Sequence, residues 1–528
     1  MTTGTKITYV SIGSTPGFDE EFEAALAAAR DEWPVGLASS IDGAGGGGPE
    51  IDVRSPVDRR IVVARMGTAT EADVGRAFAA AETAFPAWRA LGWQRRIAIL
   101  RDAAERIVAE KFRTAALMVH EIGKTRLEAM AEVEEAADLL RYYSGVMEGE
   151  NGYRRPMARV APGEATESVL APYGVFAVIS PFNFPMALAA GMVGAALAAG
   201  NTVVFKPSEE APISGAALCA ALWAAGVPRS ALHLLLGTGA AVGAAMLGDP
   251  RAAGVAFTGS YDVGMQVVRG AARDFPRPVV VEMGGKNPAI VTAAADVEAA
   301  AIAVARSAFG YGGQKCSACS RVYVERAVAG ELTRRLVDEA GKLRVGDPAR
   351  RDTFLGPLVD ARAVARYRAA IDEIRAAGGE VLAGGRVLDE GDLAHGFFVA
   401  PTVARLPRPD HRLFEDELFL PLLLVQAVAG LDEALALANR SRFGLTAGLF
   451  SRDAGEVRRF LDGIEAGVCY VNRKSGATTG AWPGINPFGG WKGSGSGGPA
   501  ALGPHYLLKF LREQSRTVND VDLGESHP

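Results

Sequence analysis

The sequence has few of the side chains that form disulfide frameworks or metal clusters. Its 528 residues include only four cysteines and six histidines. Four cysteines are too few for a disulfide scaffold at this length, and the histidines lack the spacing of metal ligands, so we predict no metal site. Cys316 and Cys319 do form a Cys-x-x-Cys pair, for which zinc binding and redox chemistry are both weak interpretations. Two buried apolar side chains, or one reactive thiol with an inert neighbour, remain open.

Signals of nucleic-acid binding, secretion and membrane insertion are missing as well. The formal net charge is -5, without long runs of one sign, so nucleic acid is not an expected partner. The first ten residues lack the basic-then-apolar pattern of a secretory signal, and we therefore expect a cytoplasmic protein. No charged side chain lies between Glu167 and Lys206, but prolines and glycines divide this stretch. It is expected to form a buried strand–helix–strand unit and no membrane span.

What the sequence does contain is a regular alternation of short apolar runs and helical stretches. The β-branched runs of the first half begin near residues 175, 202, 232, 254 and 278. Their alternation with helical stretches predicts a parallel, doubly wound α/β sheet. A second series of helices and strands, from residue 296 onward, predicts a second α/β domain. Residues 1–50, which end in a glycine run, are expected to form an N-terminal arm with a flexible loop.

The segment GYGGQKCSACSR, residues 310–321, has the composition of a reactive loop. Its glycines allow the backbone to approach a ligand closely, and polar residues surround Cys316. No histidine lies nearby in sequence, so a carboxylate would have to serve a thiolate nucleophile as base. Glu282 is the candidate because it ends an apolar strand and is followed by two glycines. Taken alone, a buried cysteine and a solvated carboxylate explain the same residues.

Two further motifs follow predicted strands and suit a dinucleotide. KPSE covers residues 206–209, and FTGSYDVG covers residues 257–264. The second motif places Ser260 between Gly259 and Gly264 at the start of a predicted helix, where free N–H groups attract phosphate. The spacing is not that of the GxGxxG fingerprint, and a tight strand-to-helix turn explains it equally well.

Seven motifs in one order make the sequence resemble the aldehyde dehydrogenase superfamily over about residues 50–515. They are SPFNFP (180–185), FKPSE (205–209), FTGSYDVG (257–264), EMGGKNP (282–288), GQKCSACSR (313–321), ELFLP (417–421) and NPFGGWKGSG (486–495). The resemblance implies an α/β fold with a Rossmann-type NAD-binding domain over residues 51–151 and 172–282, and a second α/β catalytic domain over residues 283–486. It also implies a β-hairpin oligomerisation element, from residues 152–171 and 505–520, and hence a homo-oligomer that is at least a dimer.

The same resemblance assigns roles to particular residues. It makes Cys316 the nucleophile, Glu282 the base and Asn183 the oxyanion donor, and it leaves Cys319 as an inert neighbour. It implies NAD as the cofactor, with NADP as the alternative, because a ribose-binding carboxylate such as Glu209 would repel a 2′-phosphate. The cofactor contacts that it implies are Ser180, Phe182, Lys206, Ser208, Glu209, Gly259, Ser260, Gly284, Glu417 and Phe419.

The motifs GQKCSACSR, EMGGKNP and PHYLLKF are similar to the branch that oxidises L-glutamate γ-semialdehyde, the open form of 1-pyrroline-5-carboxylate, to L-glutamate in proline degradation. The substrate contacts that this branch implies are Phe184, Ser317, Lys315, Glu135, Leu502, Gly503 and Phe510, with Lys315 and Glu135 as an ion pair. Leu502 departs from the small residues usual at this place. Another semialdehyde, or an aliphatic or aromatic aldehyde, is therefore the alternative substrate.

Two other classes of protein share parts of this pattern. A coenzyme A-acylating aldehyde dehydrogenase uses the same thiol but usually lacks the base. A relative without enzymatic activity would be expected to lose Cys316, Glu282 or Asn183. All three residues are present, which favours an enzyme that hydrolyses its thioester.

Overall fold

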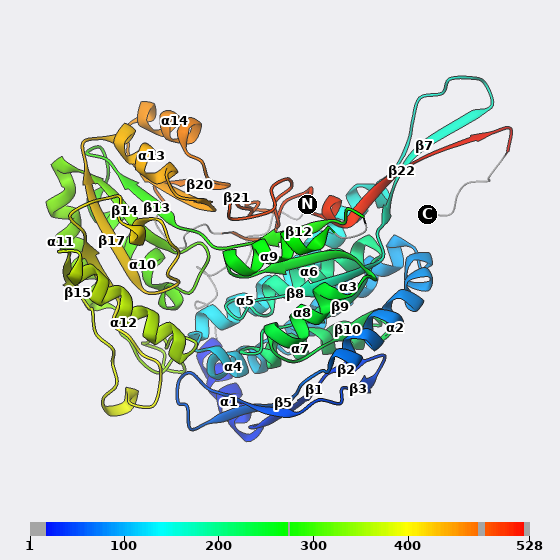
Figure 1. Ribbon diagram of the computed structural model, residues 1–528, viewed down its shortest axis with the longest axis horizontal. Coiled ribbons are helices and arrows are strands. Elements are labelled where there is room, and N and C mark those ends of the chain that lie inside the picture. Colours follow the sequence, from blue (N-terminus) through cyan, green and yellow to red (C-terminus); the bar gives the residue numbers. More distant parts are fainter. Residues whose placement is uncertain (1–16, 273–274, 474–480, 522–528) are drawn as a thin grey trace.

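The computed structural model describes residues 17–272, 275–473 and 481–521, which form two domains, each built on a seven-stranded sheet (Figure 1). The first sheet has the order β12-β11-β8-β9-β10-β2-β3, and its first five strands run parallel. These strands coincide with the five apolar runs of the sequence, so the predicted parallel α/β sheet is confirmed. The strands are β2 (Ser40–Ile41), β3 (Ala44–Gly45), β8 (Val175–Ile179), β9 (Thr202–Lys206), β10 (Leu232–Leu234), β11 (Ala252–Thr258) and β12 (Val279–Glu282).

The helices of this first domain form layers on its sheet, in which α2, α6, α7 and α9 lie against strands and α3, α4 and α5 pack on α6 and α7. In α6 every residue except Leu188 is buried, which explains why the chain carries no charge there. α2 begins at a capping box, because the Thr70 hydroxyl accepts from Asp73 N and the Asp73 carboxylate accepts from Thr70 N. No helix in the described ranges is both long and apolar enough to cross a membrane. The helices are α2 (Glu71–Ala90), α3 (Trp93–Ala109), α4 (Lys111–Ile122), α5 (Arg126–Gly149), α6 (Ala187–Ala199), α7 (Pro212–Ala224), α8 (Ala244–Gly248) and α9 (Tyr261–Ala271).

The second domain repeats the layered plan with the strand order β15-β16-β17-β14-β13-β19-β20. Its strands run parallel except for β15, which pairs antiparallel with β16 at the edge. The strands are β13 (Asn287–Val291), β14 (Cys319–Glu325), β15 (Glu380–Ala383), β16 (Thr402–Arg405), β17 (Leu422–Val428), β19 (Thr446–Phe450) and β20 (Val468–Val471). The helices are α10 (Val297–Phe309), α11 (Arg326–Lys342), α12 (Ala361–Ala376), α13 (Leu431–Asn439) and α14 (Ala454–Gly463).

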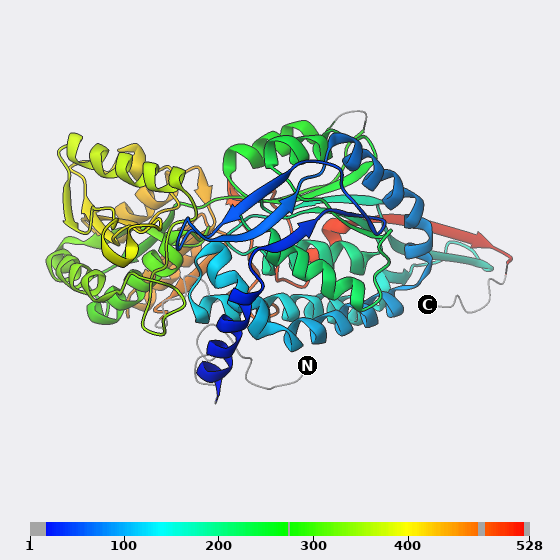
Figure 2. The same ribbon diagram turned by 90° about the horizontal axis from the view of Figure 1, so that it is seen from below.

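Residues 17–50 differ from the expected arm and flexible loop, because they form part of the first domain. α1 (Phe18–Asp31) buries Phe18, Phe22 and Leu26 in the core and packs against α4 (Figure 2). These apolar residues stand four apart, which is the spacing of one helix face. The strands β2 and β3 extend the main sheet, and β1 (Val35–Ala38), β4 (Glu50–Arg54) and β5 (Val62–Gly67) form a small sheet of their own. Residues 1–16 of the expected arm lie outside the described part.

The end of the described chain returns to the first domain and joins an antiparallel hairpin. β7 (Glu164–Pro172) pairs with β6 (Arg154–Pro156) on one side and over its full length with β22 (Leu511–Asn519) on the other. This three-stranded sheet projects from the body of the molecule (Figure 1). Before it, β21 (Trp491–Lys492) pairs with β18 (Phe443–Gly444) and so ties the returning chain to the second domain. The use of the hairpin in assembly stays a prediction.

Candidate active site

The nucleophile loop, residues 310–318, connects α10 to β14 and contains residues with positive φ. The φ angles of Tyr311 and Gly313 are 51° and 69°. A Cβ on Gly313 would lie 2.2 Å from the carbonyl oxygen of Leu420, so glycine lets the loop lie directly against the ELFLP segment. Cys316 has a partly exposed side chain, whereas Cys319 is buried as the first residue of β14. The Cys316 side chain is therefore accessible to a ligand, whereas the Cys319 side chain is not.

Asn287, at the start of β13, holds the nucleophile loop by its backbone. Its Nδ2 donates to the carbonyl oxygens of Cys316 at 2.7 Å and Ala318 at 2.9 Å, and its Oδ1 accepts from Thr446 N. A Cβ on Gly285 would lie 2.6 Å from the Cys316 carbonyl oxygen, so the loop needs this glycine as well. The sequence alone assigns no role to Asn287, although its place in the EMGGKNP motif is a signal.

Asn183, in the loop after β8, lies against the nucleophile loop. Its buried side chain donates from Nδ2 to Gln314 O at 3.0 Å. A carboxamide has two N–H donors, and this bond leaves the second for a ligand. Gln314 is itself fixed, since its Nε2 donates to the carbonyl oxygens of Tyr311 and Pro357 and its Oε1 accepts from Val359 N. The predicted oxyanion donor and the predicted nucleophile are thus on loops in direct contact.

Glu282 is the last residue of β12 and reaches the edge where parallel strands bind ligands. Its Oε2 accepts from Gly490 N at 3.2 Å, and its carbonyl oxygen accepts from Gly259 N at 3.1 Å. Burial raises the pKa of the Glu282 carboxyl to about 7, against the opposing effects of Lys509 and the Gly490 N–H. A carboxyl with this pKa is half ionised at neutral pH, which suits a general base.

Glu417, from the ELFLP segment, lies against the two glycines that follow Glu282. Its Oε1 accepts from Gly285 N at 2.9 Å. A Cβ on Gly284 would lie 1.9 Å from Glu417 Oε2, so any side chain at Gly284 would displace this carboxylate. Burial also raises the pKa of Glu417 to about 7.

The surroundings of the Cys316 thiol disfavour its ionised form. Burial raises its pKa to about 12, and the carboxylates of Glu417 and Glu282 add to the rise. The backbone N–H groups of Cys316 and Ser317 act in the opposite direction and favour the thiolate. A base and a positive charge near the sulfur are therefore needed before Cys316 can act as a nucleophile.

The predicted cofactor residues at the carboxyl end of β9 form a connected group. Lys206 Nζ lies 3.3 Å from Glu209 Oε2, and Glu209 Oε1 accepts from Gly239 N at 3.3 Å. Ser208 serves the local turn, since its hydroxyl accepts from Glu210 N. Ordered charged groups at this edge of a parallel sheet are suited to the ribose of a nucleotide.

A second group of predicted cofactor residues surrounds the same edge. Ser260 is the N-cap of α9, with its hydroxyl accepting from Val263 N, so the helix N-terminus can bind phosphate. The Ser180 hydroxyl is buried and has no hydrogen-bond partner in the described part of the chain, which leaves it for a ligand. The rings of Phe182 and Phe419 lie 6.0 Å apart, edge to face. These residues fit a dinucleotide.

Two of the predicted substrate contacts lie elsewhere than expected. Lys315 forms its ion pair with Glu128 at 2.8 Å, and the predicted partner, Glu135, is buried further along α5. Glu128 is in the first turn of α5, next to the nucleophile loop, which explains the difference. Phe510 is fully buried with its ring 5.0 Å from that of Phe176, so it fills the core of the first domain instead of lining a substrate.

The predicted anchoring loop contains a strained residue. Leu502 is buried with a φ of 61°, a conformation that favours glycine. Its N–H donates to the Tyr143 hydroxyl at 3.1 Å, and its carbonyl oxygen accepts from Gly484 N at 3.1 Å. The N–H of Gly503 has no hydrogen-bond partner among the described residues. Gly503, and not Leu502, therefore offers a backbone donor to a ligand.

The remaining predicted substrate contacts adjoin catalytic residues. Phe184 follows Asn183 and is partly exposed, and Ser317 follows Cys316 and is buried. The ammonium group of Lys124 lies 3.7 Å from the centre of the Phe184 ring. One face of the Phe184 ring is thus occupied by Lys124, a residue to which the sequence motifs assign no role.

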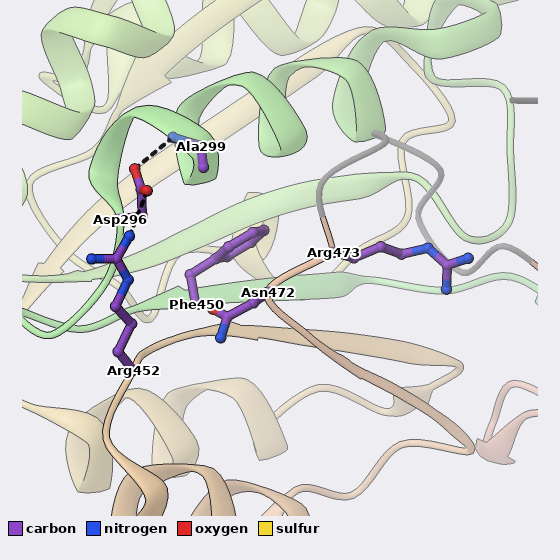
Figure 3. A pocket seen from close by; sticks show the side chains of 6 residues that line it. All are labelled: Asp296, Ala299, Phe450, Arg452, Asn472 and Arg473. Atoms are coloured by element: carbon purple, nitrogen blue, oxygen red, sulfur yellow. Dashed lines mark hydrogen bonds and ion pairs between the residues drawn. The ribbon is translucent and has the colours of Figure 1, made fainter.

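A cavity of about 180 Å³ lies in the second domain, apart from these groups (Figure 3). Within it Asp296 caps α10 by accepting from Ala299 N, and it pairs with Arg452 at 2.7 Å. Arg473 points away from this pair in Figure 3. The lining residues are Asp296, Ala299, Phe450, Arg452, Asn472 and Arg473, and no predicted site residue is among them. The cavity is therefore not part of the candidate active site.

Comparisons with known proteins agree with this geometry. The Aldehyde dehydrogenase family model matches residues 44–515. A protein of Geobacillus kaustophilus (strain HTA426) named 1-pyrroline-5-carboxylate dehydrogenase is 37% identical over 473 residues, which cover 88% of this chain and 89% of that protein. The crystal structure of 1-pyrroline-5-carboxylate dehydrogenase from Thermus with bound NAD is 33% identical, with a TM-score of 0.92, and the match covers 98% of this chain and 100% of that one.

A more distant solved structure has the same fold. Betaine aldehyde dehydrogenase from Staphylococcus aureus in complex with NAD+ is 27% identical, with a TM-score of 0.88, and the match covers 96% of this chain and 99% of that one. The family match spans both domains and includes each of the seven motifs, so the resemblance drawn from those motifs is confirmed. The chain belongs to the aldehyde dehydrogenase family.

Proposed function

We propose that this chain oxidises an aldehyde to a carboxylic acid through a thioester on Cys316, with NAD as the hydride acceptor. The observation that carries the proposal is the arrangement of two loops and two carboxylates around this thiol. Asn183 lies against the nucleophile loop through its 3.0 Å bond to Gln314 O. The carboxylates of Glu282 and Glu417 are close enough to Cys316 to raise its pKa.

The first half of the reaction forms a carbon–sulfur bond. Glu282, with a pKa of about 7, accepts the proton of the Cys316 thiol. When bound, the oxidised nicotinamide supplies a positive charge that favours the thiolate and an acceptor for hydride. The thiolate attacks the aldehyde carbon, and the carbonyl oxygen becomes an oxyanion that the Asn183 amide and the Cys316 N–H stabilise. One such donor lowers the barrier by about 3 kcal/mol.

The second half releases the acid. As the oxyanion collapses, the C–H bond breaks, hydride leaves with its two electrons, and the carbon remains on Cys316 as a thioester. Glu282 releases the thiol proton to solvent and, ionised again, takes a proton from water. The hydroxide attacks the thioester carbon, and the C–S bond breaks with the thiolate as leaving group. One aldehyde is oxidised and one cofactor is reduced in each turnover.

The preference for NAD over NADP rests on Glu209. Its carboxylate lies beside Lys206 and accepts from Gly239 N at the edge of the first sheet. A carboxylate in this place binds ribose hydroxyls and repels a 2′-phosphate. NADP is the alternative cofactor, since Lys206 offers a positive charge close by.

For the substrate we propose L-glutamate γ-semialdehyde, oxidised to L-glutamate as a step of proline degradation. The relative from Geobacillus kaustophilus and the structure from Thermus both carry the name 1-pyrroline-5-carboxylate dehydrogenase. The unpartnered N–H of Gly503 and the hydroxyl of Ser317 would bind the α-carboxylate, beside the ring of Phe184. The buried side chain of Leu502 favours a second candidate, an aldehyde without a bulky polar end.

We further propose a cytoplasmic homo-oligomer, at least a dimer, that uses the hairpin of residues 152–171 with the strand of residues 505–520. The three-stranded sheet β22-β7-β6 projects from the body and has open edges (Figure 1). Such an edge presents unpaired backbone groups with which another chain can pair. We retain residues 51–151 and 172–282 as the NAD-binding domain and residues 283–486 as the catalytic domain.

A substrate panel tests the proposed function. The protein is incubated with NAD and, separately, with L-glutamate γ-semialdehyde, succinic semialdehyde, and simple aliphatic and aromatic aldehydes, while the absorbance of reduced cofactor is followed. We expect the highest kcat/KM with L-glutamate γ-semialdehyde and none with the Cys316→Ala variant. Turnover of every aldehyde only after addition of coenzyme A would contradict the hydrolytic mechanism. A higher kcat/KM with an unsubstituted aldehyde would contradict the substrate.

A further inference from the structure

Two carboxylates on one face of α5 face the nucleophile loop and the oxyanion loop, which we define as residues 180–186. Glu128 and Glu132 stand four residues apart, on the same side of the helix. Glu128 pairs with Lys315 of the nucleophile loop at 2.8 Å. Glu132 pairs with Lys124, and both side chains of this pair are fully buried. The first turns of α5 lie near the second domain (Figure 1), and the reaction described above uses neither Lys124 nor Glu132.

Glu132 fixes the end of the oxyanion loop. Its Oε1 accepts from Met186 N at 2.9 Å and from Ala187 N at 3.4 Å, where the loop enters α6. A carboxylate is favourable at a helix N-terminus because the first N–H groups lack helical partners. These bonds begin three residues after Asn183 in the chain. They therefore help to fix the backbone position from which the Asn183 side chain reaches the nucleophile loop.

Lys124 contacts both loops at once. Its ammonium group lies 3.7 Å from the ring centre of Phe184, next to Asn183, and 5.1 Å from the ring centre of Tyr311, in the nucleophile loop. Cations over aromatic faces are attracted by the ring quadrupole, most strongly in a dry interior. The Tyr311 hydroxyl donates to Ile122 O, which holds this ring beside the segment that carries Lys124.

Stability alone does not account for this pair. Burial lowers the pKa of Lys124 and raises that of Glu132, so the interior opposes both charges. Apolar residues of similar volume often replace such pairs without loss of stability. A buried, fully bonded polar group can instead fix one geometry among several.

We propose that Lys124 and Glu132 are positioning residues that hold the oxyanion loop against the nucleophile loop, so that Asn183 and Cys316 meet at one carbonyl group. The inference rests on the proposed function, since it concerns an oxyanion formed at Cys316. It predicts that the pair contributes to kcat through Asn183.

The first test compares two lysine-to-methionine variants. Lys124→Met removes the charge and keeps the chain length. Lys111→Met is the matched control, because Lys111 pairs with Glu134 at 2.7 Å and joins α4 to α5 at a more exposed place. We expect Lys124→Met to lower kcat by roughly 10- to 100-fold, as a displaced reacting group does, with an unchanged KM for NAD. The control should lose less than about twofold, as for exposed ion pairs. Equal losses in the two variants would overturn the proposal.

A double-mutant cycle tests whether Lys124 acts through Asn183. Asn183→Ala alone should lower kcat by about 10²- to 10³-fold, the usual effect of losing an oxyanion donor. In that background Lys124→Met should add less than about twofold, because the donor that it positions is already absent. If the two fold-decreases in kcat multiply in the double variant, Lys124 acts independently of Asn183.

Two assays that need no cofactor distinguish a loss of loop positioning from a general loss of structure at the site. Hydrolysis of p-nitrophenyl acetate requires the thiol and its oxyanion donors, so it should fall in parallel with kcat in Lys124→Met. Alkylation of Cys316 by iodoacetamide needs no oxyanion donor, and its rate, followed at this residue by mass spectrometry, should stay within about twofold. A parallel loss of alkylation would overturn the proposal. A wild-type protein that cleaves the ester but oxidises no aldehyde would contradict the proposed function, and the ester assay would still test the pair.

A double variant in which both residues of the pair are neutral keeps the proposal testable if Lys124→Met does not fold. Lys124→Met combined with Glu132→Gln removes both charges and keeps a carbonyl oxygen for Met186 N. We expect this variant to melt within roughly 5 °C of wild type, with kcat still lowered at least about tenfold. Wild-type kcat in a folded neutral pair would refute the positioning role.

Discussion

Cys316 and Cys319 are three residues apart in the chain, yet their thiols differ in exposure and in their hydrogen-bond neighbours. Burial raises the pKa of both thiols to about 12, so acidity does not distinguish them. Cys316 is partly exposed on a loop beside Asn183, whereas Cys319 is buried in β14 with its thiol donating to Arg321 O. Access and neighbouring donors, and not the resting pKa, therefore favour Cys316 as the reactive cysteine of the proposed function.

The largest predicted effect comes from removing each of the two thiols in turn. Cys316→Ala should lower kcat/KM by a factor on the order of 10⁴ or more, because no other group can form the thioester. Cys319→Ala should leave kcat within a few-fold and lower the melting temperature slightly, as loss of a small buried group does. Steady-state assays and thermal melts of the two variants check this. A comparable loss of activity in Cys319→Ala would contradict the assignment.

The next largest effect compares two strands that each end in glutamate. β12 ends in Glu282 at the active site, and β14 begins at the nucleophile loop and ends in Glu325, where the carboxylate accepts from Ala293 N. Glu282→Gln should lower steady-state kcat by about 10²- to 10⁴-fold, and it should also slow the first turnover, seen as the burst of reduced cofactor, because this carboxylate takes the thiol proton too. Glu325→Gln should leave both phases unchanged. A Glu282→Gln variant with a burst at the wild-type rate would show that another group takes the thiol proton and would restrict this residue to the second half of the reaction.

The parts that local pattern specifies could be predicted from the sequence. The five parallel strands of the first domain follow from β-branched runs. Motifs whose residues are neighbours in the chain single out Cys316, Glu282 and Asn183, and the roles of these three residues stay predictions. α1 was missed, although Phe18, Phe22 and Leu26 have the spacing of a helix face. A short segment with many charged residues gave a weaker signal than the glycine run that follows it.

The contacts that hold the two loops together could not be predicted, because they join distant parts of the chain. Lys315 pairs with Glu128, 187 residues earlier, and no local pattern separates Glu128 from Glu135 on the same helix. The role of Asn287 needs the fold, since its amide reaches Cys316 only after β13 and β14 pair. Phe510 likewise has the sequence neighbours of a substrate contact, but its helical turn directs it into the core.

A smaller effect is expected where the two glycines after Glu282 make room for Glu417. In Gly284→Ala the new Cβ would lie 1.9 Å from Glu417 Oε2, so the carboxylate must move away. We expect a decrease in kcat/KM of about 10²-fold, with a raised KM for NAD. Gly341→Ala is the control, because a Cβ there meets nothing within 4 Å on α11. Equal kinetics in the two variants would show that Glu417 does not depend on Gly284.

The smallest effect is a pH dependence that sharpens the comparison of the two strands that end in glutamate. The proposed base, Glu282, must be ionised to take a proton from water, and burial raises its pKa to about 7. Above this pH most of the base is active, and below it the ionised fraction approaches a tenfold decrease per pH unit, so kcat should fall by about that factor. Steady-state kcat measured across this range in Glu325→Gln should follow the same curve as wild type, whereas the residual rate of Glu282→Gln should be flat. A wild-type profile that stays level below neutral pH would mean that another group removes the proton, and the carboxylate at the end of β12 would lose its role as the base.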